Sequence, residues 1–156
     1  MANNFTTTRN IELSVINYLE TEIPGSWSNI AVVKGFNQAY KEPLPVVAIR
    51  LINTTSTRKE LGNYDLRNVY SITLDIFAKS DGQRLDLSDS ILNMIKKGIP
   101  YYVFSHSSGD PETLDKVQDG KLVINTFNEN RKLEFSLEGL SAHDKYRHII
   151  RFTVRR

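Results

Sequence analysis

Acidic, basic and histidine side chains that could take part in catalysis occur along the chain, but few of them have the spacing that catalysis requires. Asp75 and Lys79 flank the end of a predicted strand, where metal-dependent nucleases place an acid and a lysine. Three residues separate the two, whereas such nuclease sites commonly use a single residue. An acid and a lysine are also common at strand ends for structural reasons. We therefore expect no catalytic role for this pair.

The remaining candidates for metal binding are three histidines and a pair of acids. His106, His143 and His148 have no metal-ligand spacing, and His148 falls on the apolar face of a predicted strand. Asp86 and Asp89 are neighbours on a predicted helix, where paired acids usually form a solvated face. The sequence has no phosphate-binding loop, dinucleotide-binding glycine pattern or nucleophile elbow. We expect no metal site, no cofactor and no enzymatic activity.

Basic residues cluster on the last predicted strand. Arg147, Arg151 and Arg155 project from one face of this strand, and Lys145 and Arg156 adjoin them. Two interpretations remain open. The first is a solvated sheet edge, where basic residues deter pairing with another strand. The second is contact with phosphate or with an acidic neighbouring subunit.

A second basic group, Arg58 and Lys59, lies in a polar segment over residues 53–63 and has the same two interpretations. Few aromatic residues are interleaved with either group, so sequence-specific recognition of single strands is not expected. The net charge of +2 is mild and does not by itself indicate a nucleic-acid partner. Any electrostatic role therefore depends on local clustering.

The length and composition predict one domain over residues 1–156. Because the chain has no cysteine, it has neither a disulfide framework nor thiolate chemistry. Its apolar runs are much shorter than the roughly 18 residues of a membrane span. The first residues also lack the apolar segment of a secretion signal. We expect no membrane partner.

The clearest elements are a strand over residues 70–78 and a helix that follows it. Apolar and polar residues alternate along the strand, which is the period of a half-buried strand. Ser80 and Gln83 have the spacing of a capping box, and apolar residues then recur at helical spacing. Gly98 and Pro100 end the helix. We expect this strand and helix to anchor the fold.

The first half of the chain predicts a helix over residues 11–22, followed by Trp27 as a packing residue. Residues 30–40 and 46–52 are strand candidates, and we interpret them as a hairpin joined by a proline-containing link. Residues 53–63 are too polar to pack and too long for a tight turn. They form either an exposed loop or the tip of an extended hairpin into the next strand.

The second half of the chain predicts further strands. Residues 99–104 are apolar and aromatic, which favours a buried strand. Residues 105–120 are polar, and residues 110–112 have the cap, proline and acid of a short helical turn. Residues 121–127 and 133–137 alternate on either side of a polar turn, which predicts a hairpin. Together the elements predict a single-domain α+β fold with a mostly antiparallel (mixed) β-sheet and two main helices packed on one face.

This layout resembles the tail terminator or tail completion proteins of long-tailed bacteriophages. It consists of an N-terminal helix, an early hairpin, a long strand ending in the sequence DIFAKSDGQR at residues 75–84, and an amphipathic helix. The resemblance covers residues 11–102 and is strongest over residues 69–95. It is a pattern of elements with a short, loosely matching stretch and contains no catalytic signature.

The resemblance implies a virion structural protein without enzymatic activity, located in the tail or neck and assembled in the host cytoplasm. Proteins of this family form a hexameric ring on the head-proximal end of the tail tube, stop its growth and join the head. The implied partners are further copies of the chain, the tail tube protein and a head-completion or connector protein. The resemblance implies that the cations contact passing DNA in the lumen or the acidic edge of the next subunit. These cations are Arg58, Lys59, Arg147, Arg151 and Arg155.

Two alternatives remain. A head-completion or neck connector protein could share the size and the long loops of this chain, and only its position in the particle would distinguish it. A small basic nucleic-acid-binding module is the alternative from a different class. Binding through several phosphate contacts would fall steeply with salt, whereas a ring subunit should bind free duplex weakly or not at all.

Overall fold

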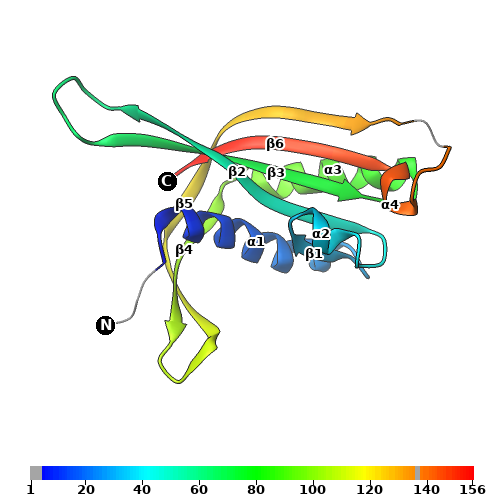
Figure 1. Ribbon diagram of the computed structural model, residues 1–156, viewed down its shortest axis with the longest axis horizontal. Helices are drawn as coiled ribbons and strands as arrows, with labels where there is room; N and C mark the ends of the chain where they lie inside the picture. The colour runs from blue at the N-terminus through cyan, green and yellow to red at the C-terminus, as the bar shows by residue number, and fades with distance from the viewer. Residues whose placement is uncertain (1–4, 136–137) are drawn as a thin grey trace.

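The computed structural model describes residues 5–135 and 138–156, apart from the side chain of Pro111. Within these residues the chain forms helices and strands that are arranged around one curled sheet (Figure 1). In chain order they are α1 (Thr7–Ser26), β1 (Ala31–Lys34), α2 (Phe36–Ala39), β2 (Val46–Arg58), β3 (Leu66–Phe77), α3 (Asp81–Ile95), β4 (Ile99–Ser107), β5 (Asp110–Leu133), α4 (Ala142–Lys145) and β6 (Arg147–Arg155).

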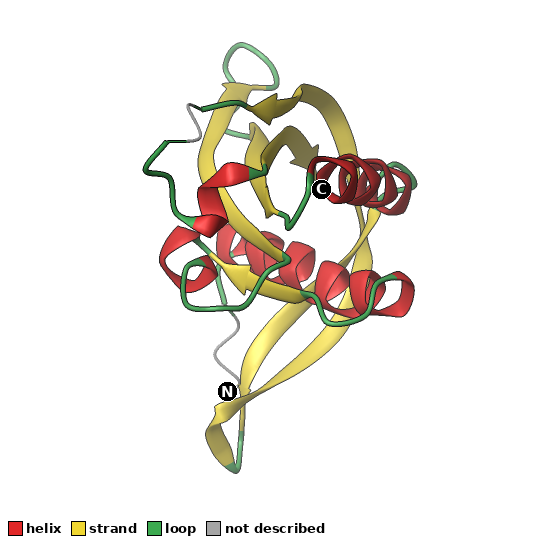
Figure 2. Cartoon of the chain, turned by 90° about the vertical axis from the view of Figure 1, so that its right-hand side faces the viewer, coloured by secondary structure: helices red, strands yellow, loops and turns green. Residues whose placement is uncertain are grey.

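The strands form one six-stranded sheet in the order β1-β2-β3-β6-β5-β4. The pair β1 and β2 is parallel, and the other neighbouring pairs are antiparallel. The sheet is curled, and the two long helices, α1 and α3, lie against its inner side (Figure 2). The predicted fold class, an α+β domain with a mostly antiparallel mixed sheet and two main helices on one face, is confirmed.

The core lies between the inner face of the sheet and the two long helices. The central strand β3 contributes Ile72, Leu74 and Ile76, which are fully buried against Leu19 of α1 and Ile91 of α3 in one continuous cluster. Each such side chain contributes roughly 1.5–3 kcal/mol of burial free energy before conformational entropy is subtracted. This cluster fixes the position of both helices on the sheet.

The start of α3 matches the capping signal in the sequence. The hydroxyl of Ser80 accepts a hydrogen bond from the amide of Gln83 at 3.2 Å. The side-chain oxygen of Gln83 accepts one from the amide of Lys79 at 2.7 Å, one residue earlier than in a standard capping box. Both bonds satisfy amides that have no partner inside the helix, so the sequence defines the point where the strand ends and the helix begins.

We expect Ser80→Ala to lower the free energy of unfolding by about 1 kcal/mol, because one amide of the first turn loses its acceptor. Urea unfolding followed by circular dichroism measures the change. Ser90→Ala is the matched control, since Ser90 lies within α3 and makes no side-chain hydrogen bond with the described residues. Equal losses in the two variants would contradict a capping role.

Helix α1 is longer than the predicted helix over residues 11–22 and runs to Ser26, with Pro24 inside its last turn. The helix continues past the proline because the carbonyl of Ile23 accepts a hydrogen bond from the amide of Trp27 at 2.9 Å. Trp27 also packs against the core, as predicted. Packing at the helix end therefore outweighs the local preference of Pro24 to end the helix.

The predicted hairpin over residues 30–40 and 46–52 is wrong. The first strand, β1, runs parallel to β2, with Ala31 opposite Val46, and residues 36–39 form the short helix α2. A positive φ of 77° at Gly35 turns the chain into α2, whose Phe36 ring packs edge-on against Phe77. The link thus covers a small apolar cluster on the outer face of the sheet and cannot form a hairpin.

Strands β2 and β3 continue beyond their neighbours as a two-stranded projection, which we call the β2–β3 arm (residues 54–69). Residues 53–63 therefore belong to an extended hairpin, and the alternative of an exposed loop is wrong. A register shift between Leu51 and Asn53 marks the point where the arm leaves the body. At its tip, Leu61 is fully exposed and Tyr64 is 90% exposed.

A second projection, the β4–β5 arm (residues 103–119), leaves the body in a different direction (Figure 1). Its strand β5 is continuous over Asp110–Leu133, so the predicted helical turn at residues 110–112 and the predicted hairpin turn before residue 133 are both wrong. The first half of β5 pairs with β4 and the second half with β6, with register shifts that interrupt the alternation. Residues 136–137 of the predicted strand over residues 133–137 lie outside the described residues.

Candidate functional site

The structure separates the five predicted cations into three places. Arg147 and Arg151 lie on the outer face of β6, in the middle of the sheet. Arg155 lies at the other end of β6, about 26 Å from Arg147 along an extended strand. There it lines a pocket together with Lys59, whereas Arg58 is exposed on the β2–β3 arm. The alternation along β6 predicted that the three arginines share one face. It could not show that Arg147 and Arg151 lie beside acids whereas Arg155 lines a pocket.

On the outer face, Arg147 and Arg50 flank a buried acid, Asp75. Asp75 is 1% exposed, and its carboxylate oxygens lie 3.4 Å from Nη2 of Arg147 and 3.9 Å from Nε of Arg50. The Arg147 guanidinium lies 4.8 Å from the centre of the Phe77 ring, and that of Arg50 lies 3.8 Å from the centre of the Phe36 ring. The two cations are therefore held between a carboxylate and aromatic rings.

Burial raises the pKa of Asp75, and the charges of Arg147 and Arg50 offset only part of that rise. The offset is partial because neither ion pair is as short as a charge-assisted hydrogen bond. Arg151 also faces an acid of its own chain, with Nη1 at 3.5 Å from Glu129 Oε2. The central arginines therefore compensate acids within the chain, and this geometry favours a structural role for them over an open basic surface.

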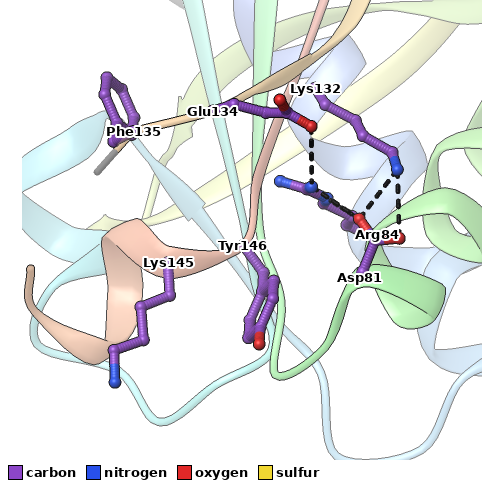
Figure 3. Close-up of a pocket in the computed structure, with 7 residues that line it drawn as sticks. All are labelled: Asp81, Arg84, Lys132, Glu134, Phe135, Lys145 and Tyr146. Carbon is purple, nitrogen blue, oxygen red and sulfur yellow. Dashed lines mark hydrogen bonds and ion pairs between the residues drawn. The ribbon is translucent and has the colours of Figure 1, made fainter. Parts of the chain in front are cut away.

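A pocket of about 440 Å³ lies where β5 ends and where α3 and β6 begin (Figure 3). Arg84, which is buried, holds Asp81 through Nε and Nη2 at 2.9 and 2.6 Å. Its Nη1 donates to the main-chain oxygens of Leu133 and Arg147 at 3.3 and 3.1 Å. One arginine thus joins three elements, and Lys132 completes the network by binding Asp81 at 2.9 Å.

Arg84 was not predicted from the sequence, although one signal was available. A cation in the first turn of a helix is disfavoured by the helix dipole, so an arginine there indicates a partner elsewhere in the fold. Figure 3 shows Arg84, Asp81 and Lys132 directed toward one another, while Lys145 points away from them. Because these charges are paired within the chain, the network can stabilise the junction but does not present a free acid and base.

The second basic location is a pocket of about 570 Å³ that extends along the β2–β3 arm, from Lys59 beside its turn to Tyr70 at its base, and we call it the basic pocket. Among the described residues no acid lines it, and Thr7, the first residue of α1, lies at its edge. Arg156 was noted in the sequence as the neighbour of Arg155, whereas Arg67 was missed because only the pairing of β3 with β6 brings it near Arg155. The basic pocket is lined by four cations, Lys59, Arg67, Arg155 and Arg156.

The histidines lie apart from one another, and the described part of the chain contains no group of three or more His, Cys, Asp or Glu residues that could hold a metal ion. His143 contacts the Glu42 carbonyl at 2.8 Å. His148 lies on the buried inner face of β6, where its Nε2 donates to Asn130 Oδ1. Burial and the charge of Arg84 lower the pKa of His148.

This lowered pKa predicts that stability falls on acidification. His148 stays neutral in the folded protein at a pH where the unfolded chain already binds a proton, so the unfolded state binds more protons below a pH of about 6.5. We expect this contribution to be complete above that pH and to decline as the pH falls below about 6.5. Urea unfolding at several pH values measures this decline, and His148→Gln should reduce it. The exposed His106→Gln is the control, and an equal change in both variants would contradict the assignment.

No helix in residues 5–135 and 138–156 is long and apolar enough to cross a membrane. No protein-family model and no curated protein sequence matches the chain.

Proposed function

We propose that this chain is a structural subunit of a bacteriophage virion that forms a ring on the head-proximal end of the tail tube. The observation that carries the proposal is the pair of two-stranded arms that project from a compact body in different directions (Figure 1). In this role the ring stops growth of the tube and provides the surface that joins the head.

The arms support a role in assembly because they have little core of their own. A two-stranded hairpin is at best marginally stable in water unless it packs against another surface. The β2–β3 arm exposes Leu61 and Tyr64 at its tip, and Val117 on the β4–β5 arm is 70% exposed. Contact with a neighbouring subunit would cover these apolar side chains and stabilise the arms.

The charged groups support a structural role over an enzymatic one. The buried acid of the outer face is paired with arginines, and the network around Arg84 is satisfied within the chain. An enzyme would need an acid, a base or a metal set directed at an accessible cavity. The pocket around Arg84 instead uses its side chains to join α3, β5 and β6.

The partners implied by this proposal are five further copies in a hexameric ring, the tail tube protein and a head-completion or connector protein. The virion would be its location, after assembly in the host cytoplasm. A head-completion or neck connector protein differs from this proposal only in its position in the particle. The basic pocket favours a second candidate of another class, a small nucleic-acid-binding module, because four cations surround it.

The solution mass of the purified protein, measured by light scattering over a wide concentration range, tests the proposal. The ring predicts a mass six times that of the 17.8 kDa chain at high concentration. A monomeric mass throughout would contradict a ring that assembles without the tail tube. Binding of free duplex DNA that falls steeply with salt would favour the nucleic-acid-binding module.

A further inference from the structure

We propose that the acidic β4–β5 arm of one subunit docks into the basic pocket of a second copy of the same chain. This inference names the contact between neighbouring subunits, and it rests on the proposed ring. It is argued from the charges of the two surfaces, from the partners that those charges lack, and from the symmetry that such a contact allows.

The β4–β5 arm is strongly acidic. Its sequence contains one lysine, Lys116, whose Nζ binds Asn17 of α1 at 3.0 Å and lies 4.9 Å from the Tyr102 ring centre. This cation is therefore turned toward the body of its own subunit. Asp115, the preceding residue of the strand, projects from the opposite face. The acids of the arm are Asp110, Glu112, Asp115 and Asp119.

Three of these acids, Asp110, Glu112 and Asp115, make no ion pair with a described residue. Asp110 accepts hydrogen bonds from the Glu112 amide and the Thr113 hydroxyl, and so stabilises the turn at the tip of the arm. The carboxylates of Glu112 and Asp115 make no ion pair with a described residue. They are the groups that an external cation would bind.

The basic pocket contains cations that lack acidic partners. Lys59, Arg67 and Arg155 line it, and none of them makes an ion pair with a described residue. The positive charges around this pocket repel one another, and an acidic group placed between them would attract all of them. The pocket is therefore suited to a carboxylate-bearing segment.

One contact inside the subunit shows that the two surfaces match. Asp119, at the base of the β4–β5 arm, pairs with Arg156 of the basic pocket. The arm then leads away from the C-terminus, so Glu112 and Asp115 lie toward its far end (Figure 1). Among the described residues neither acid has such a partner, so a neighbouring subunit could supply it.

This contact is compatible with a ring. The arm and the pocket are different patches of one chain, so each subunit can donate its arm to one neighbour and receive an arm from another. Such a heterologous contact closes into a ring when the rotation between neighbours allows it. A two-fold dimer that exchanges arms would use the same contact, and a mass of two chains instead of six would identify it. A two-fold dimer that set arm against arm would bring acids together, and one that set pocket against pocket would bring cations together.

The charges favour a second copy over nucleic acid as the occupant. The acidic arm starts beside the basic pocket, at the Asp119–Arg156 pair, and its carboxylates would repel a phosphate backbone that follows the pocket. The net charge of the whole chain is only +2. A carboxylate-bearing arm meets the same cations without this repulsion.

Charge reversal on each surface tests the contact. The pocket variant carries Arg67→Glu and Arg155→Glu, and the arm variant carries Glu112→Lys and Asp115→Lys. Each variant alone should need at least about a hundredfold higher concentration to assemble, because like charges now face each other. An equimolar mixture should regain the wild-type mass, since the acidic arm of one variant fits the basic pocket of the other and the reverse also holds. Lys96→Glu with Lys97→Glu, on the exposed end of α3, is the matched control and should assemble normally.

The outcomes separate this contact from the ring itself. A wild-type ring with unchanged assembly of both reversed variants would overturn the contact and leave the ring proposal standing. Failure of the mixture to regain the wild-type mass, with both variants folded by circular dichroism, would also overturn it. Duplex DNA bound by the wild type and lost only in the pocket variant would assign the pocket to phosphate instead.

Cross-linking tests the contact even if the wild type does not form a stable ring. Because the chain has no cysteine, Leu66→Cys beside the pocket and Val117→Cys on the arm provide single reactive positions without changing charge. Two differently sized versions, each carrying one cysteine, should give a covalent heterodimer with a short bismaleimide. Val117→Cys paired with Lys97→Cys is the control and should give little product. Equal yields from the two pairs would overturn the contact, whereas a wild type that is monomeric throughout counts against the ring.

Discussion

Shortening the β2–β3 arm is expected to abolish assembly while the body remains folded. The variant replaces residues 57–67 by Asn-Gly, which joins Ser56 to its cross-strand neighbour Asn68 through a two-residue turn. The removed residues are exposed, so the core loses no buried side chain. The exposed tip, with Leu61 and Tyr64, and two cations of the basic pocket are lost together.

Light scattering measures the loss of assembly, and thermal unfolding of the same sample shows whether the body remains folded. The shortened chain should be monomeric at concentrations where the wild type assembles, and its melting temperature should change little, because none of the removed side chains is part of the core. Ser108→Asn, which makes the other turn Asn-Gly because residue 109 is already glycine, is the control, since it keeps both arms at full length. Wild-type assembly by the shortened chain would contradict a role for this arm between subunits.

Arg84→Met is expected to lower the free energy of unfolding by about 2–5 kcal/mol, because two partly buried main-chain oxygens lose their donor and the buried guanidinium is removed. These are the carbonyls of Leu133 and Arg147, at the ends of two strands that the guanidinium joins to α3. Methionine retains much of the packing of the arginine stem, so the loss reports mainly on the hydrogen bonds. Denaturant unfolding gives the size of the effect.

Asp81→Asn is the matched control for this prediction. Hydrogen bonds from Lys132 and Arg84 hold the pKa of Asp81 below its usual range. The Asp81 carboxylate is exposed to solvent, so its removal should destabilise the protein much less than the removal of Arg84. Similar losses in the two variants would show that the ion pair, rather than the bonds to the strand ends, fixes the junction.

The elements that could be predicted from the sequence are those whose signals are local. The strand before Ser80 and the helix after it follow from alternation, a cap and helical periodicity, and all three were confirmed. The last strand, β6, was predicted for the same reason. These signals suffice because they depend on neighbours within one or two turns along the chain.

The elements that could not be predicted depend on distant partners. Strand β1 pairs with β2 in the parallel direction, and α2 forms because it covers Phe77, which lies more than thirty residues away. In β5, register shifts between Ile124 and Thr126 and between Phe127 and Glu129 interrupt the alternation, so a continuous strand resembled a hairpin. The early hairpin in the resemblance to tail terminators is wrong. That resemblance now depends on the first helix, the long strand and the helix after it.

The candidate site was predicted only in part for the same reason. Charge spacing along one strand identified Arg147, Arg151 and Arg155 but could not show that two of them lie beside acids of their own chain. The basic pocket requires the arm, the end of β6 and the start of α1 to meet, and this depends on the pairing of β3 with β6. A surface formed by three separate elements leaves no single pattern in the sequence.

Electron microscopy of the purified protein at high concentration tests the central proposal most directly. The account predicts closed rings of six equal subunits around a central channel, formed by the wild type and by the mixture of the two reversed variants. It also predicts no rings for the chain with the shortened β2–β3 arm. Isolated single subunits at every concentration, or rings that form equally well without the arm, would contradict it.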